Sequence, residues 1–320
     1  MPINADKPHL WKADTRASVD QFNQWFMQFA PAAYRETRRK TVSEVAHALM
    51  LTNDLASISP EIIKSHPGIV QVLRMSTCPP LARDRLVGLA DTSKSLVETL
   101  ESAKIPPRIS QDSLEEHLEK ITRILSNMLD VDIFPWLEGN RAPSRQERYR
   151  SSTIIADRLC GAVADPIVRN AQEKRQLAIV AQYLTAKGYK LKAHPAKVQL
   201  VQMEPGTFSF RLNVFVKSPD IETIGTKIPV DAVIQPLNAK LPHLPFLIEA
   251  KSAGDFTNVN KRRKEEATKI HQLKNTFGEK VVFVLFLCGY FDAAYLGYEA
   301  AEGIDWIWEH RLEDIDQLGI

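Results

Sequence analysis

The stretch PFLIEAKSAGDF, residues 245–256, decides the fold. Its apolar run over 246–248 is typical of a buried strand, yet it leads directly into Glu249 and Lys251. Because alternate residues of a strand share a face, Glu249 and Lys251 point the same way and Ala250 points oppositely. Two opposite charges on one side of a buried strand's end require an explanation, and the rest of the sequence supplies one.

Further strand-like runs surround this stretch. They cover 208–216, 228–235 and 281–287, and a helix over about 258–277 precedes the last of them. Short links predict an antiparallel meander for the first three strands, 245–251 included, whereas the connection through a helix predicts a parallel fourth strand. The expected fold class is α/β, in the α+β sense, with a mixed sheet of four to five strands flanked by helices.

The N-terminal part has a different pattern. Apolar residues recur at three- and four-residue spacing throughout 1–137, which predicts a helical region. A polar stretch with Gly, Pro and Ser over 138–152 predicts a basic linker or hinge, and a catalytic domain is expected over 153–320. Within that domain Asp165 and Pro166 are expected to open a helix, and the tail after Gly303 is expected to be amphipathic.

Composition excludes several classes of protein. The 320 residues carry a net charge of only +2, so any surface for nucleic acid must be local. Three separated cysteines, with no CxxC and no Cys/His cluster, argue against a disulfide framework or a zinc site. The chain has neither a signal-peptide pattern nor 18 consecutive apolar residues, which predicts a cytoplasmic protein without a membrane partner.

The charged strand end predicts a catalytic site. Asp231 interrupts the apolar run of 228–235, and pairing of the two strands would bring it close to Glu249. Two carboxylates are suited to Mg²⁺, which can activate a water and neutralise a phosphodiester, while Lys251 can stabilise the developing charge or orient the water. Glu249-Ala250-Lys251 is the single Glu-x-Lys or Asp-x-Lys triplet of the chain. The alternative is a solvated ion pair at a strand end.

A third acid and a set of basic residues extend this hypothesis. The inward stripe of a helix over 177–184 leads back to Glu173, which is either an additional metal or water ligand or the partner of a nearby cation. The side chains predicted to contact DNA phosphates are Lys261, Arg262, Arg263, Lys264, Lys269, Gln272, Arg145 and Arg148. Their alternative is an ordinary solvated helix face and a solvated linker.

The pattern resembles a known group of enzymes. Asp231 and Glu249-x-Lys251, set on a helix, three strands, a helix and a strand, resemble the PD-(D/E)xK nucleases, although Pro229 stands two residues before Asp231 instead of directly before it. The longer stretches 211–234, 245–274 and 289–315 look like type II restriction endonucleases of the XamI type.

The resemblance implies a Mg²⁺-dependent endonuclease that cuts double-stranded DNA at a short palindrome, GTCGAC for XamI-like enzymes. It implies a homodimer, because a two-fold site suits two-fold symmetry, and a companion DNA methyltransferase. Metal-binding roles fall to Asp231, Glu249, the carbonyl of Ala250 and Glu173, and the essential lysine is Lys251. Region 1–137 is expected to serve DNA recognition or dimerisation.

Two alternatives remain. One is a repair or structure-specific nuclease with the same core. The other is a non-catalytic DNA-binding module on a degenerate nuclease fold, against which the complete Asp, Glu and Lys set argues.

Overall fold

The computed structural model describes residues 2–320 except 140, 194–198, 218–224 and 257–258, and the side chains of 163–165 and 259–263 also lie outside the described part. The chain packs as two compact units. The first unit comprises Met1–Phe29 and Val168–Ile320, and the second comprises Ala30–Ile167.

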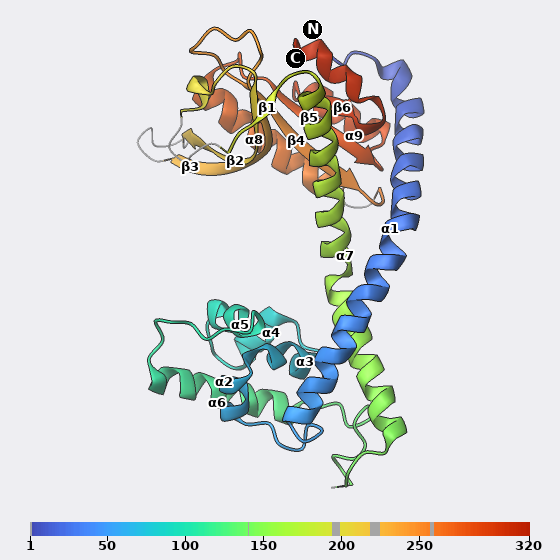
Figure 1. The fold of residues 1–320 in the computed structure, drawn as a ribbon, viewed down its shortest axis with the longest axis vertical. Coiled ribbons are helices and arrows are strands. Elements are labelled where there is room, and N and C mark those ends of the chain that lie inside the picture. Colours follow the sequence, from blue (N-terminus) through green and yellow to red (C-terminus); the bar gives the residue numbers. More distant parts are fainter. Residues whose placement is uncertain (1, 140, 194–198, 218–224, 257–258) are drawn as a thin grey trace. The chain divides into compact units, whose positions relative to one another are not determined.

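The described residues of the first unit form a six-stranded sheet in the order β1 to β6 (Figure 1). The strands are β1 (Lys190–Leu191), β2 (Thr207–Lys217), β3 (Gly225–Ile234), β4 (Phe246–Ala253), β5 (Phe283–Gly289) and β6 (Asp305–Trp308). β2, β3 and β4 pair antiparallel, which confirms the predicted meander. β5 pairs parallel to β4 through the helix α8 (Val259–Phe277), which confirms the predicted crossover.

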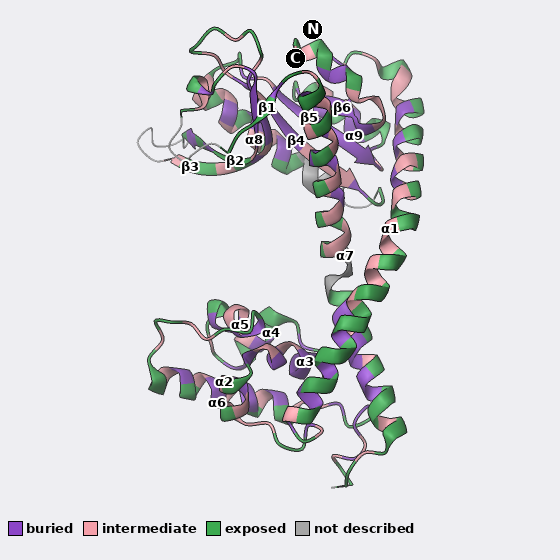
Figure 2. Ribbon diagram, viewed as in Figure 1, coloured by how far each residue is buried: buried purple, intermediate pink, exposed green. Residues whose placement is uncertain are grey.

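Helices cover both faces of this sheet. Alternate residues of β4 belong to different cores: Leu247 packs with Ile270 of α8 on one side, and Ile248 packs with Leu177 of α7 on the other. The α9 helix (Ala293–Ala301) lies on the α8 side, and the 3-10 segment η3 (Glu309–Leu318) lies on the α7 side. The central strands are therefore buried on both faces, as Figure 2 shows in purple.

The α7 helix corrects one local prediction. It runs from Arg145 to Ala186 with Pro166 inside it, so the predicted helix start at Asp165 and Pro166 is wrong. Residues 145–152, expected in a polar linker, are helical as well. The reason is packing. Ile155 and its neighbours on the same face are buried in the second unit, and the free energy gained by this burial offsets the cost of the backbone hydrogen bond that Pro166 cannot donate.

The C-terminal tail and the number of strands differ from the expectation. The tail, expected to be an amphipathic segment that packs Trp306 and Trp308, buries both side chains but also forms a strand, β6. In the N-terminal region, the helix α1 (Pro8–Leu51) continues through Pro31. Short β1 and β6 at the two sheet edges account for the six strands observed where four to five were expected.

The second unit is helical, and the helices predicted for the N-terminal region are confirmed. Its core joins the later part of α1 and the earlier part of α7 to short helices between them. These are α2 (Pro60–Ser65), η1 (Pro67–Ile69), α3 (Val70–Met75), α4 (Arg83–Leu89), α5 (Lys94–Glu101) and α6 (Gln111–Asn127); the 3-10 turn η2 (Leu200–Gln202) belongs to the first unit. Within the described part of the chain, no helix combines the length and the hydropathy needed to cross a bilayer.

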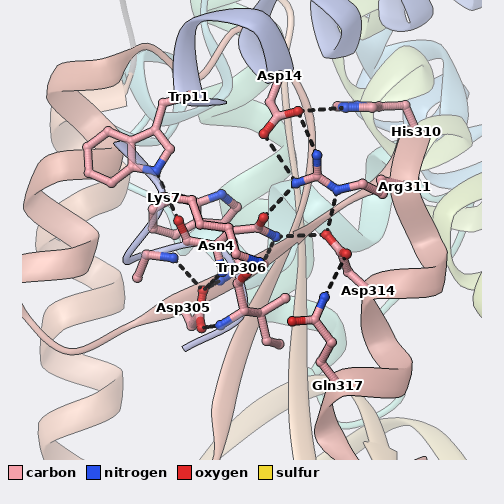
Figure 3. Close-up of polar contacts among 12 residues, drawn as sticks. Asn4, Lys7, Trp11, Asp14, Asp305, Trp306, His310, Arg311, Asp314 and Gln317 are labelled. Atoms are coloured by element: carbon pink, nitrogen blue, oxygen red, sulfur yellow. Dashed lines mark hydrogen bonds and ion pairs between the residues drawn. The ribbon is translucent and has the colours of Figure 1, made fainter. Parts of the chain in front are cut away.

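The N-terminal residues are fastened to the C-terminal end of the first unit (Figure 3). The side chain of Asn4 donates to the carbonyl of Trp306 (2.9 Å) and to Asp314 (3.0 Å), and it accepts from Arg311 (2.5 Å). Arg311 also binds Asp314 (2.7 Å) and Asp14 (2.9 Å). One guanidinium therefore neutralises two buried carboxylates and fixes the start of the chain.

Replacing Arg311 by Met is expected to destabilise the protein. Asp14 and Asp314 are each only 7% exposed, so both would lose their charged partner in a buried setting. Because the Arg311 side chain is itself 26% exposed, we expect a loss of about 2 kcal/mol in chemical denaturation, less than for a fully buried pair. The exposed Arg123→Met is the control. An unchanged unfolding midpoint for Arg311→Met would contradict this role.

Candidate active site

The site forms where β3 and β4 separate. Their register pairs Val233 with Leu247 and Ala232 with Ile248, and the next step of the same register would place Asp231 opposite Glu249. At that step the Asp231 carboxylate accepts a hydrogen bond from the backbone N–H of Ala250 at 2.9 Å. The predicted neighbouring of the two strands is confirmed, and both carboxylates lie at the same point of the sheet.

The electrostatic setting of Asp231 is that of an acid beside another acid. Burial raises the pKa of Asp231, and the negative charge of Glu249 raises it further. The hydrogen bond from Ala250 and the charge of Lys269 act in the opposite direction, and the resulting pKa is about 6. A cation bound between the two carboxylates would remove this penalty, so the pair is suited to binding one.

Glu249 is held by two lysines. Its carboxylate lies 3.3 Å from the ammonium of Lys251 and 2.6 Å from that of Lys269, and the Glu249 residue is 8% exposed. Lys269 comes from α8 and also donates to the carbonyl of Pro229 on β3 at 2.6 Å. Its amine, expected on a DNA-facing surface, therefore lies in the site. Each carboxylate oxygen of Glu249 faces one ammonium group.

Lys251 has a second carboxylate partner, Glu266, which comes from α8. Glu266 of α8 is 1% exposed, and its Oε1 lies 3.3 Å from the Lys251 ammonium. Burial lowers the pKa of Lys251, but Glu249 and Glu266 outweigh burial and the net shift is upward. Glu266 was not predicted as a site residue. The available indication in the sequence was its position on the helix face of Ile270 and Leu273, where a carboxylate needs a partner.

Glu173 lies on α7 and forms an ion pair. Its Oε1 accepts from the guanidinium of Arg211 at 2.7 and 3.0 Å, so its partner is a cation far along the chain. Its negative charge contributes to the raised pKa of Asp231. Arg211 has a left-handed backbone (φ 52°) in the middle of β2, where the register sets it across from Asp231. Strain of this kind in a non-glycine residue is concentrated at functional sites. No sequence pattern indicated it.

The donors at this point fit a divalent cation of the Mg²⁺ type. Among the described residues, no cluster of three or more His, Cys, Asp or Glu has metal-binding geometry. Mg²⁺, however, is commonly held by one or two carboxylates together with waters and substrate phosphates. Asp231, Glu249 and the Ala250 carbonyl could supply these ligands. Because both oxygens of Glu249 face lysines, a cation has to compete with at least one ammonium group.

The predicted DNA-contacting residues are spread over the chain. Lys264 is exposed on α8, and Gln272 is half-buried on the same helix. Lys261, Arg262 and Arg263 belong to α8, but their side chains lie outside the described residues. Arg145 and Arg148 belong to the second unit, where Arg145 is exposed and Arg148 binds Asp54 at 2.5 and 2.9 Å.

Comparison with known proteins identifies the class. The model of the XamI restriction endonuclease family matches residues 53–308, and the chain belongs to this family of type II restriction endonucleases. It is 55% identical to the type II restriction enzyme SalI of Streptomyces albus G over 317 residues, which are 99% of each chain. It is 23% identical to the type II restriction enzyme XamI of Xanthomonas campestris pv. amaranthicola over 225 residues, 68% of this chain and 73% of that enzyme. No solved structure matches.

The chain is therefore a restriction endonuclease, a hydrolase that acts on DNA, as the resemblance implied.

Proposed function

We propose that this endonuclease uses a PD-(D/E)xK site composed of Asp231, Glu249 and Lys251 to hydrolyse both strands of DNA in a Mg²⁺-dependent reaction. The observation that supports this most strongly is the separation of β3 and β4 at Asp231 and Glu249, with Lys251 on the same side as Glu249. The proposed recognition sequence is GTCGAC, the palindrome that the resemblance implies.

The residues have distinct proposed roles. Asp231, Glu249 and the Ala250 carbonyl hold the metal, with Glu173 near enough for its charge to act on Asp231. Bound there, Mg²⁺ would lower the pKa of a coordinated water and offset charge on the phosphate. Lys251 directs its ammonium at the same point and stabilises the negative charge that develops on the phosphate oxygens.

DNA binding needs a wider surface than this site. We assign phosphate contacts to Lys261, Arg262, Arg263, Lys264, Gln272, Arg145 and Arg148. Lys269, also predicted as a DNA contact, binds Glu249 in the structure and would reach a phosphate only after release. The helical region 1–137 is proposed to serve recognition or dimerisation. A homodimer would match a palindrome, and a methyltransferase specific for the same site would protect host DNA.

The test is digestion of a large unmodified DNA by the purified protein, with Mg²⁺ and with EDTA. Discrete fragments with Mg²⁺ and none with EDTA support the proposal, and sequencing of the fragment ends reads the recognition site. Ends at sequences other than GTCGAC would refute that site alone. A smear would favour a nuclease without sequence specificity, and intact DNA with every divalent metal would contradict the assigned reaction.

Lys269→Met is expected to raise metal affinity. The substitution frees one oxygen of Glu249 from an ammonium group 2.6 Å away, so a cation no longer has to displace it. Calorimetric titration of the DNA-free protein with Ca²⁺ should show binding several-fold tighter than in the wild type. Lys274→Met is the matched control, because Lys274 lies on the same helix and pairs with the exposed Glu279. Equal or weaker Ca²⁺ binding by Lys269→Met would show that the lysine does not compete.

A further inference from the structure

The catalytic lysine is held from two sides. The Lys251 ammonium lies 3.3 Å from Glu249 Oε1 and 3.3 Å from Glu266 Oε1, and its side chain is 19% exposed. Glu249 comes from the same strand, whereas Glu266 comes from the helix that packs over the sheet. The two carboxylates differ in their proposed roles: Glu249 is also a proposed metal ligand, whereas Glu266 is not.

Glu266 is a costly residue at its position. It is 1% exposed, and burial of an ionised carboxylate without partners is strongly unfavourable. Burial raises its pKa and outweighs Lys251, Tyr295 and Glu299, which act in the opposite direction. The structure supplies a partner for each oxygen: Oε1 faces Lys251, and Oε2 accepts the Tyr295 hydroxyl at 2.9 Å. An apolar residue would fill this core position without those requirements, so the carboxylate serves a specific contact.

Tyr295 is itself fixed. It is 3% exposed on α9, and its backbone N–H donates to the Asp292 side chain that caps this helix (2.8 Å). Glu299, buried on the same helix, interacts with the Tyr295 hydroxyl and with the Glu266 carboxyl. Glu266 is therefore held in one orientation by a second helix, independently of the residues proposed to bind metal.

We propose that Glu266, oriented by Tyr295, is a positioning residue for Lys251. A cation held by Glu249 would compete with Lys251 for its carboxylate, whereas Glu266, which lies outside the proposed metal ligands, would keep its contact with Lys251. The lysine then remains where a phosphate of the bound DNA can meet it. This inference rests on the proposed role of Lys251 in cleavage.

The test uses Glu266→Gln in the full-length protein, which keeps the shape and the Tyr295 contact but removes the charge. Three quantities are measured: the single-turnover cleavage rate at saturating Mg²⁺, the DNA dissociation constant in Ca²⁺, and the thermal unfolding midpoint. We expect cleavage to slow by about 10- to 100-fold, since small misplacements of a catalytic group have effects of this size. DNA affinity should stay unchanged. Glu265→Gln, an exposed neighbour on α8, should cleave at the wild-type rate.

Combination with Lys251→Met separates positioning from a structural role. Lys251→Met alone leaves the buried Glu266 without its cation and should lower the unfolding midpoint, and adding Glu266→Gln should restore part of that loss. In the Lys251→Met background, Glu266→Gln should slow residual cleavage no further. A purely structural Glu266 would instead lower stability and affinity together and leave the cleavage rate of the folded fraction unchanged.

Two results would overturn the inference. The first is cleavage at the wild-type rate by Glu266→Gln. If that variant fails to fold, the second is cleavage at the wild-type rate by Tyr295→Phe, for which we expect a several-fold slower rate at unchanged DNA affinity. If the proposed role of Lys251 in cleavage is itself wrong, the result is different: Lys251→Met would then cleave DNA at the wild-type rate.

Discussion

Lys251→Ala is expected to lower the single-turnover cleavage rate by about a thousandfold, which is the upper range for removal of one charge-stabilising donor. The ammonium lies beside Glu249 at the point where the metal-bound phosphate is proposed to sit, and alanine removes the positive charge that would face this phosphate. DNA affinity measured in Ca²⁺ should change little, because one ammonium among many phosphate contacts contributes modestly to binding.

The control for this variant is Lys187→Ala. Lys187 pairs with Asp316 at 2.6 Å, at the end of the first unit's α7 segment, and has no proposed role in DNA binding or cleavage. Wild-type cleavage by Lys187→Ala and loss of cleavage by Lys251→Ala would support the assignment. Normal cleavage by Lys251→Ala would show that the site lies elsewhere.

Asp231→Asn is expected to abolish cleavage and yet stabilise the metal-free protein at neutral pH. The folded-state pKa of Asp231 is raised from 3.8 to about 6, so folding favours the protonated carboxyl. As the pH rises above 3.8, the unfolded chain releases this proton first, and the ionised group then destabilises the folded state. Asparagine carries no charge and can still accept from the Ala250 N–H. The gain at pH 7 to 8 should be on the order of 1 kcal/mol.

The measurement is urea denaturation in EDTA at several pH values. The difference between Asp231→Asn and wild type should be absent near pH 4, grow through about pH 6 and level off above it. Asp316→Asn is the matched control of opposite sign. Burial raises the pKa of Asp316, but Lys187 and Tyr183 together outweigh burial and the net shift is downward. A lower free energy of unfolding for Asp231→Asn than for the wild type at pH 7 would contradict the unfavourable interaction between the Asp231 and Glu249 carboxylates.

The strand pattern allowed most of the sheet of the first unit to be predicted. Strand-like apolar runs located β2 to β5, and the parity rule placed Glu249 and Lys251 on one face, where the structure finds them 3.3 Å apart. The helix boundaries were harder to predict from the sequence. Pro166 has the local features of a helix start, but the residues on both sides pack into cores, and that packing keeps the helix continuous.

The surroundings of the site depended on contacts distant in sequence. Lys269 looks like one more cation of a basic helix, and its position beside Glu249 follows only from the packing of α8 on the sheet. The pairing of Glu173 with Arg211 joins α7 to β2 across 38 positions, and the left-handed backbone of Arg211 has no indication in its own residue type. Such contacts arise from tertiary packing, which a periodicity does not encode.

The most direct test of the assigned site is a crystal structure of the protein with a GTCGAC duplex and Mn²⁺ as an anomalous scatterer. The account predicts an anomalous peak roughly 2 Å from the carboxylates of Asp231 and Glu249, the coordination distance of a small hard cation. The Lys251 ammonium should then face the adjacent phosphate. A peak bound by other residues, with Asp231 and Glu249 empty, would contradict the site.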